Sequence, residues 1–267
     1  MGAAGVAVAA PADPGAGRVL ARSVLRVVGF WWLTTGLIVA LQRSPGTRLV
    51  ALVLSAALAL LGVRLLVQTR DDCSRRGAER AFVAGALLWL WVATTFYGGW
   101  IVGPPLDVPL PPERAAMPLA LLALRATAYH EVLGLAVLAG AIALHGRNPV
   151  SWQAVGLFWL ADKLGRLNVF LGVANPGTHF LPDHLAFLEG FFGPPRNSPL
   201  LVPTAVAFAA LASWLLRRAL RTDEPFTRSA SALLAVLAAL ATLEHVVLGA
   251  DWTLPLWDLF LAWRTSL

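Results

Sequence analysis

Ionisable side chains interrupt three otherwise apolar stretches of this sequence. They are Arg125, His130 and Glu131 in residues 117–144, Asp162, Lys163 and Arg166 in residues 150–173, and Glu244 and His245 in residues 229–250. A single charge facing hydrocarbon costs ~2.5–3.5 kcal/mol on insertion scales, so these groups must pair with one another or line a wet cavity. The cations and the carboxylates are equal in number, three of each. The sequence therefore predicts one neutral polar cluster inside the membrane.

Helix geometry indicates the depth and the neighbours of this cluster. At a rise of about 1.5 Å per residue, four of the groups fall in the outer half of the membrane: Arg125, Arg166, Glu244 and His245. Asp162 and Arg166 also stand four residues apart on one helix face, in the favourable acid-first order. We expect the three stretches to pack together, with Tyr129 and Asn168 beside the charges. Such a cluster either fixes the register of the helices or has a functional role, and the sequence leaves both open.

Two adjacent pairs, His130-Glu131 and Glu244-His245, raise the question of a metal. Together they supply two imidazoles and two carboxylates, which would suit iron or another transition metal. Adjacent helical residues point about 100° apart, however, and helical bundles usually space their Glu and His ligands three residues apart. We therefore predict no catalytic residues, no metal and no permanent cofactor. A histidine that ligates the metal of a tetrapyrrole is the alternative.

Composition explains why these charges must be buried in a membrane protein. Of the 267 residues, 58% are hydrophobic and 13% are charged, against ~25% charged in soluble domains. Cys73 is the single cysteine, which excludes an internal disulfide and a zinc module. Nearly all the basic residues are arginines between apolar runs, where membrane topology explains them better than nucleic-acid binding does. No Walker loop, GxGxxG, GxSxG or HExxH motif is present.

Seven apolar stretches are long enough to cross a hydrocarbon core of ~30 Å. They are residues 24–42, 48–68, 81–102, 117–144, 150–173, 200–219 and 229–250. The predicted fold class is an all-α integral membrane protein, with a flexible cytoplasmic tail over residues 1–23 and one polytopic domain over 24–267. Thirteen arginines fall on the side of the N-terminus and five on the other side. By the positive-inside rule, the N-terminus is cytoplasmic and the C-terminus periplasmic.

Two further segments are expected to lie at the outer membrane interface. After Pro182, apolar residues recur with helical spacing at Leu181, Leu185, Leu188 and Phe192, which predicts a short amphipathic helix. Residues 251–264 carry three tryptophans but are too short to cross. His179 and His184, in the outer loop, are expected to be solvated rather than ligands.

Several motifs in this order resemble a known family. They are Trp31-Trp32-Leu-Thr-Thr-Gly36, Tyr129-His130-Glu131, the run RLNVFLGV with Phe170, Leu171 and Gly172, the run FLPDHL with Phe180, Leu181, Pro182 and His184, and Leu243-Glu244-His245. The pattern resembles the PuhE family of photosynthetic complex assembly proteins, over residues 30 to 264. The segment 193–203 departs from that family, which places a basic segment there, so a docking role of this loop is not carried over.

The resemblance implies a multi-pass protein of the inner (cytoplasmic or intracytoplasmic) membrane. It implies an assembly factor for the photosynthetic reaction centre or core complex, linked to bacteriochlorophyll supply. Its partners would be reaction-centre subunits or pigment-synthesis proteins, and we favour a role without catalysis. The alternative is an intramembrane enzyme or pigment carrier that uses the His/Glu pairs on a metal or on bacteriochlorophyll.

Overall fold

The computed structural model describes residues 14–104, 116–250 and 255–266, and within these ranges the chain is helical and has no strand. The α-helices are α1 (Pro14–Ala40), α2 (Pro45–Thr69), α3 (Arg75–Tyr97), α4 (Ala116–Ala126), α5 (Ala128–Leu144), α6 (Val150–Leu171), α7 (Leu201–Arg221), α8 (Pro225–Gly249) and α9 (Asp258–Ser266). Three 3₁₀ segments are η1 (Thr178–Phe180), η2 (Asp183–Phe191) and η3 (Pro255–Trp257).

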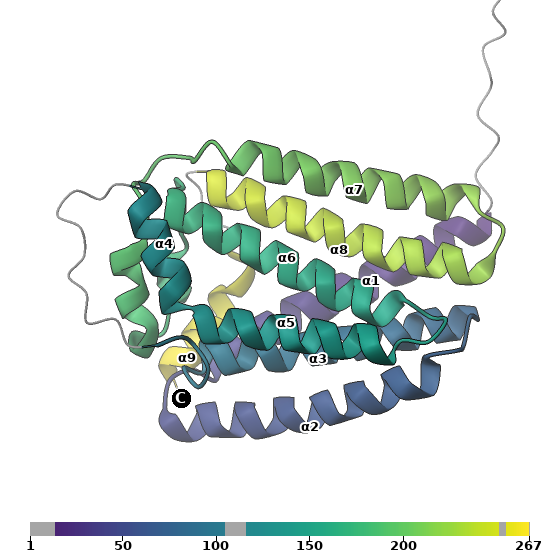
Figure 1. The fold of residues 1–267 in the computed structure, drawn as a ribbon, viewed down its shortest axis with the longest axis horizontal. Coiled ribbons are helices and arrows are strands. Elements are labelled where there is room, and N and C mark those ends of the chain that lie inside the picture. Colours follow the sequence, from purple (N-terminus) through teal and green to yellow (C-terminus); the bar gives the residue numbers. More distant parts are fainter. Residues whose placement is uncertain (1–13, 105–115, 251–254, 267) are drawn as a thin grey trace, which may run out of the picture.

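The long helices run roughly side by side in a bundle, with α3 and α8 the most buried among those of membrane-spanning length (Figure 1). Helix α2 packs on α3, α7 packs on α8, and α1 and α6 each pack on both central helices. Five helices, α1, α2, α3, α7 and α8, are long and apolar enough to cross a membrane. The bent pair α4 and α5 makes a sixth if it is counted as one span. Helix α6 has the length but carries Asp162, Lys163 and Arg166.

Local sequence signals explain where several helices begin. The Ser44 side chain accepts a hydrogen bond from the Thr47 amide in a capping box, and Pro45 occupies the first turn. Helix α8 begins similarly, because Glu224 accepts from the amides of Phe226 and Thr227 ahead of a proline in the first turn. These caps satisfy amides that have no partner within the helix.

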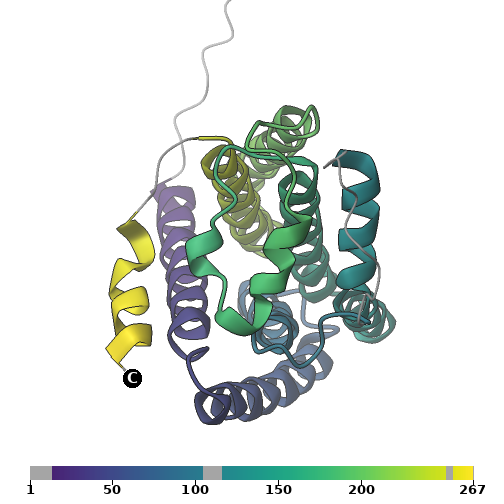
Figure 2. The same ribbon diagram turned by 90° about the vertical axis from the view of Figure 1, so that its left-hand side faces the viewer.

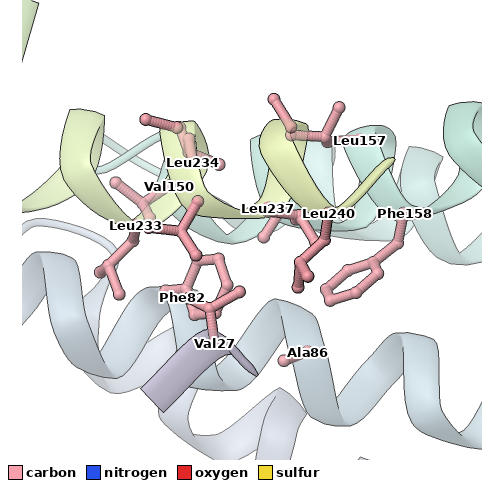
Figure 3. Close-up of a cluster of buried hydrophobic side chains, with 14 of the residues drawn as sticks. Val27, Phe82, Ala86, Val150, Leu157, Phe158, Leu233, Leu234, Leu237 and Leu240 are labelled. Atoms are coloured by element: carbon pink, nitrogen blue, oxygen red, sulfur yellow. The ribbon is translucent and has the colours of Figure 1, made fainter. Parts of the chain in front are cut away.

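The main core lies where α3, α6 and α8 meet α1 (Figure 3). Phe82 from α3, Phe158 from α6, and Leu233 and Leu237 from α8 are buried there, together with Val27 from α1. Small residues let the helices approach closely. A Cβ atom at Gly85 of α3 would overlap the Ser151 carbonyl of α6, so this crossing requires glycine.

Helix α1 begins earlier than predicted. The helix starts at Pro14, so residues 14–23 are helical rather than a flexible tail, whereas residues 1–13 lie outside the described part. The arginines in this stretch interrupt the apolar pattern but are good helix formers. Tertiary packing also holds this stretch, because Ala16 and Ser23 are buried, and just beyond it Arg26 pairs with Glu79 of α3 at 2.8 Å.

The two predicted interfacial segments are helical, with differences in detail. The segment after Pro182 is the 3₁₀ segment η2, and it lies across one end of the bundle (Figure 2). Because a 3₁₀ helix has 3.0 residues per turn, its buried residues are Leu185, Leu188 and Phe191, not Phe192 as an α-helical period predicts. At the C-terminus, α9 packs along α1. Residues 251–254 of the predicted Trp-rich segment lie outside the described part.

Candidate functional site

Side chains from α5 and α6 form a cluster that we call the α5–α6 ion-pair cluster. Its members are His130, Glu131, Asp162, Lys163 and Arg166. Lys163 Nζ lies 2.9 Å from Glu131 Oε2, and Arg166 Nη1 lies 3.7 Å from Glu131 Oε1. Arg166 Nη2 also pairs with Asp162 Oδ2, which lies 3.5 Å from His130 Nε2. Two acids thus meet two cations, with a buried imidazole beside them.

A break between α4 and α5 positions the α5 half of the cluster. The two helices are bent by 62° at Thr127, whose hydroxyl donates to the Ala123 carbonyl at the end of α4. The backbone amide of His130 donates to the carbonyl of Val102, in the loop that follows α3, at 3.0 Å. This bond takes the place of the usual helical bond to the carbonyl of Ala126, four residues back. Helix α5 therefore restarts with Glu131 in its first turn. The positive end of the helix dipole stabilises a carboxylate there.

Helix α3 supplies an aromatic wall to the cluster. The Arg166 guanidinium carbon lies 4.5 Å from the centre of the Phe96 ring, a cation–π arrangement. The His130 ring lies 4.7 Å from Phe96 and 6.2 Å from Trp89, measured between ring centres. Neither ring nitrogen of His130 has a hydrogen-bond partner among the described residues. The cluster is therefore neutralised in charge but retains unused hydrogen-bonding capacity.

Glu244 on α8 has a separate environment. Its Oε1 accepts a hydrogen bond from Trp31 Nε1 of α1 at 2.8 Å, and it has no ion pair within the described ranges. Asp162 of the cluster is within electrostatic range of it. The carboxyl of Glu244 thus extends the polar layer toward α1 without adding a cation partner.

The polar layer differs from the predicted one in its membership. Arg125 lies exposed on α4, and Tyr129 is 54% exposed. The prediction assumed one continuous helix over 117–144, and the bend at Thr127 turns Arg125 away from the α5–α6 ion-pair cluster. The predicted layer had three acids and three cations. The structure instead pairs two acids with two cations and places Glu244 apart from them.

Asn168 and His245 are buried but belong to other contacts. The Asn168 amide donates to Thr204 of α7 at 3.1 Å and accepts from Ser198 at 2.8 Å. His245 Nδ1 lies 2.8 Å from the Ala241 carbonyl, and its ring packs on Phe208. Both side chains join α6 or α8 to α7.

The four candidate metal ligands do not converge. His130 and Glu131 face α6, whereas Glu244 faces Trp31 and His245 faces Phe208. Throughout the described ranges, no three His, Cys, Asp or Glu side chains are grouped so that they could hold a metal ion.

The residues of the FLGV and FLP motifs hold the capped end of the bundle, where η1 and η2 lie (Figure 2). Gly172 has φ +120°, and a Cβ atom there would meet the Pro194 carbonyl at 2.6 Å. Phe170 packs with Leu185 of η2 in a second buried cluster, to which Leu171 and Leu181 contribute at the edge. The remaining members also have defined places: Pro182 is buried, Phe180 packs on Trp257, and His184 bonds to the Tyr97 carbonyl.

Sequence reasoning missed two asparagines that close the C-terminal end of α8. The Asn175 amide nitrogen bonds to the Leu248 carbonyl at 2.9 Å, and the Asn197 side chain bonds to the Gly249 carbonyl at 2.9 Å. Their signal is the pattern of two asparagines next to Pro or Ser in a loop, which is too common to be recognised alone.

Fold and site together define an all-helical bundle with several helices of membrane-spanning length and a buried ion-pair cluster near its capped end. The chain belongs to the family described as "Protein of unknown function (DUF3623)", which matches residues 19–266. A Rhodobacter capsulatus protein described as "Uncharacterized 30.4 kDa protein in puhA 5'region" is 29% identical over 231 residues, or 83% of each chain. No solved structure matches the chain significantly.

Proposed function

We propose that this protein is an assembly factor of the PuhE type for the photosynthetic reaction centre, acting in the inner membrane without catalysis. The observation that carries the proposal is the relative whose name places it in the puhA 5' region. The resemblance of the motifs to the PuhE family supports the same assignment. On this proposal, the protein binds reaction-centre subunits or pigment–protein intermediates and is linked to bacteriochlorophyll supply.

The α5–α6 ion-pair cluster supports a role without a permanent metal. Glu131 and Asp162 are already engaged by Lys163 and Arg166. A metal that recruited either carboxylate would leave a largely buried cation without its partner, which is strongly unfavourable. The cluster is better suited to fixing how α5 and α6 pack, and so to holding a binding surface in one shape.

The experiment is a deletion strain of a pigment-producing phototroph, complemented with the wild-type gene or with variants. We expect the deletion to lower the amount of assembled reaction centre, and Asp162→Asn to restore it less well than wild type. The exposed Asp223→Asn variant is the matched control and should restore it fully. Crosslinking in membranes should recover reaction-centre or pigment-synthesis proteins. Unchanged reaction-centre and tetrapyrrole levels in the deletion strain would contradict the proposal.

A pigment carrier or metal enzyme is the second candidate, and one observation favours it. Nδ1 of His130 and Nε2 of His245 are buried and have no hydrogen-bond partner in the described part of the chain. We still expect protein purified from a pigment-producing host to be nearly colourless, with substoichiometric metal. A Soret band or stoichiometric iron that is lost in His130→Ala or His245→Ala would establish this candidate instead.

A further inference from the structure

A pocket of about 360 Å³ opens at the capped end of the bundle, and no member of the α5–α6 ion-pair cluster lines it. It lies between the start of α2, the loop that follows α3, the break between α4 and α5, and η2. Residues that line it include Arg48, Gly99, Gly103, His184, Phe187 and Phe191. None of the described residues that line it is acidic.

Arg48 lines this pocket and is anchored there by one hydrogen bond to the backbone. Its Nη1 donates to the Gly98 carbonyl at 3.1 Å, which fixes the guanidinium. Its Nε is buried and has no partner, and Arg48 forms no ion pair with any described residue. The Nε and Nη2 edge of a guanidinium presents two parallel N–H groups that match a carboxylate or a phosphate. The pocket is therefore lined by a cation that no described acidic side chain compensates.

The neighbouring His184 adds a neutral group. Its Nε2 lies 2.9 Å from the Tyr97 carbonyl, so this nitrogen carries the proton and donates. Burial lowers the pKa of His184, the bond to Tyr97 opposes the shift, and Arg48 adds to it. At neutral pH, Arg48 is thus the charged side chain among the residues that line the pocket.

Two glycines are required by the shape of this pocket. Gly99 has φ +76°, and a Cβ atom there would lie 2.7 Å from the His184 ring. A Cβ atom at Gly103 would overlap the Ala126 carbonyl. The loop after α3 can approach η2 and the helix break only because both positions lack side chains.

The rest of the lining is apolar and leads toward the outer face of α2. Phe187 is 53% exposed, and Leu185 and Phe191 lie beside it in the lining. On α2, Leu49 follows Arg48 directly and Val53 stands five residues after it, and both are exposed on this helix, which is long enough to span a membrane. An anion at Arg48 would thus have exposed apolar side chains of η2 and α2 near it.

We propose that this pocket binds the anionic headgroup of a membrane amphiphile, with its phosphate or carboxylate on the Arg48 guanidinium and its apolar chain across Phe187. The ligand chemistry is one anionic oxygen group joined to a hydrocarbon chain. A phospholipid and a fatty acid both provide it, and free phosphate provides the anion alone. The proposal does not depend on the assembly role.

The test is binding to the purified full chain in neutral detergent, followed by native mass spectrometry during titration. The probes are phosphatidylglycerol, phosphatidylcholine, palmitate and inorganic phosphate. We expect saturable binding of phosphatidylglycerol or palmitate, and the one that binds identifies the source of the anion. Saturable binding of inorganic phosphate alone, or equal binding of phosphatidylcholine and phosphatidylglycerol, would overturn the proposal.

Variants assign the binding to the pocket. Arg48→Gln should lower the affinity for the amphiphile about 10-fold to 100-fold, which is the equivalent of losing a charge-assisted hydrogen bond. Arg196→Gln is the matched control, because Arg196 is exposed at the same end of the molecule, and it should bind as wild type does. If Arg48→Gln does not fold, Phe187→Ala should still lower the affinity for palmitate or phosphatidylglycerol. Wild-type affinity in both pocket variants would refute the site.

Discussion

Arg166 is the residue that joins the two acids of the α5–α6 ion-pair cluster. It contacts Glu131 and Asp162 and lies over the Phe96 ring, with its side chain 15% exposed. Because a largely buried guanidinium cannot lose its charge, removal of either acid leaves it partly uncompensated.

Asp162→Ala should therefore lower the free energy of unfolding by about 3–5 kcal/mol, the usual cost of removing one partner of a buried pair. The measurement is denaturation in detergent or bicelles. Asp223→Ala is the control, since that side chain is 106% exposed, and it should stay within about 0.5 kcal/mol of wild type. An Asp162→Ala protein as stable as wild type would mean that solvent, not Asp162, stabilises Arg166.

His184 predicts a pH dependence at the capped end. Its pKa is lowered in the folded protein, so the unfolded chain binds more protons between the lowered pKa and the ordinary value near 6.5. Its contribution to stability is complete above pH 6.5 and is lost as the pH falls through that window. We expect the melting temperature of wild type to fall more between pH 7.5 and pH 5 than that of His184→Gln. Parallel curves would show that His184 is not responsible.

At the scale of elements, the sequence predicted most of the helices but not the break between α4 and α5. The long apolar stretches located most of the helices, and the four-residue spacing of Asp162 and Arg166 correctly predicted that these two side chains pair. The break itself depends on Val102 and Gly103, more than twenty residues before His130. Local patterns do not report such a contact, so Arg125 was assigned to the wrong surroundings. Trp31 was noticed only as part of a motif, and its bond to Glu244 required the fold.

The docking of α9 on α1 gives a matched pair of glycine variants on one helix. A Cβ atom at Gly36 would overlap the Phe260 ring of α9, whereas one at Gly29 meets nothing within 4 Å. Gly36→Ala should cost about 1–3 kcal/mol by overpacking and expose the C-terminal segment to protease. Gly29→Ala should be neutral or stabilise by up to about 1 kcal/mol. Equal protease resistance in the two variants would show that α9 does not depend on this contact.

At the scale of the whole molecule, the two ends of the bundle differ in charge and covering. The loops 70–74 and 145–149 interlock at one end, where Asn148 bonds to the carbonyls of Thr69 and Asp72. The Arg-rich segments counted on the predicted cytoplasmic side include these loops, and η1 and η2 cover the opposite end.

Reporter fusions test the orientation that this asymmetry predicts. A reporter after Arg76 should remain cytoplasmic, whereas reporters after Ser198 or at the C-terminus should be exported, because arginine-rich segments are retained inside. Alkaline phosphatase and green fluorescent protein fusions report the two sides in opposite ways. Export of the Arg76 fusion would reverse the assignment.

Hydrogen bonds join the α1 region to the C-terminal segment that contains α9. Trp32 Nε1 of α1 donates to the Leu256 carbonyl, and Arg43 Nη1 donates to the Thr265 carbonyl. Residues more than 200 positions apart thus satisfy each other's hydrogen bonds. Trp31 of α1 likewise donates its indole hydrogen bond to Glu244 of α8. The two indole donors of α1 therefore lack these acceptors in any fragment that ends before α8. A chain cut short after α7 lacks the acceptors of Trp31, Trp32 and Arg43, so we expect such a fragment to be degraded faster than the full chain.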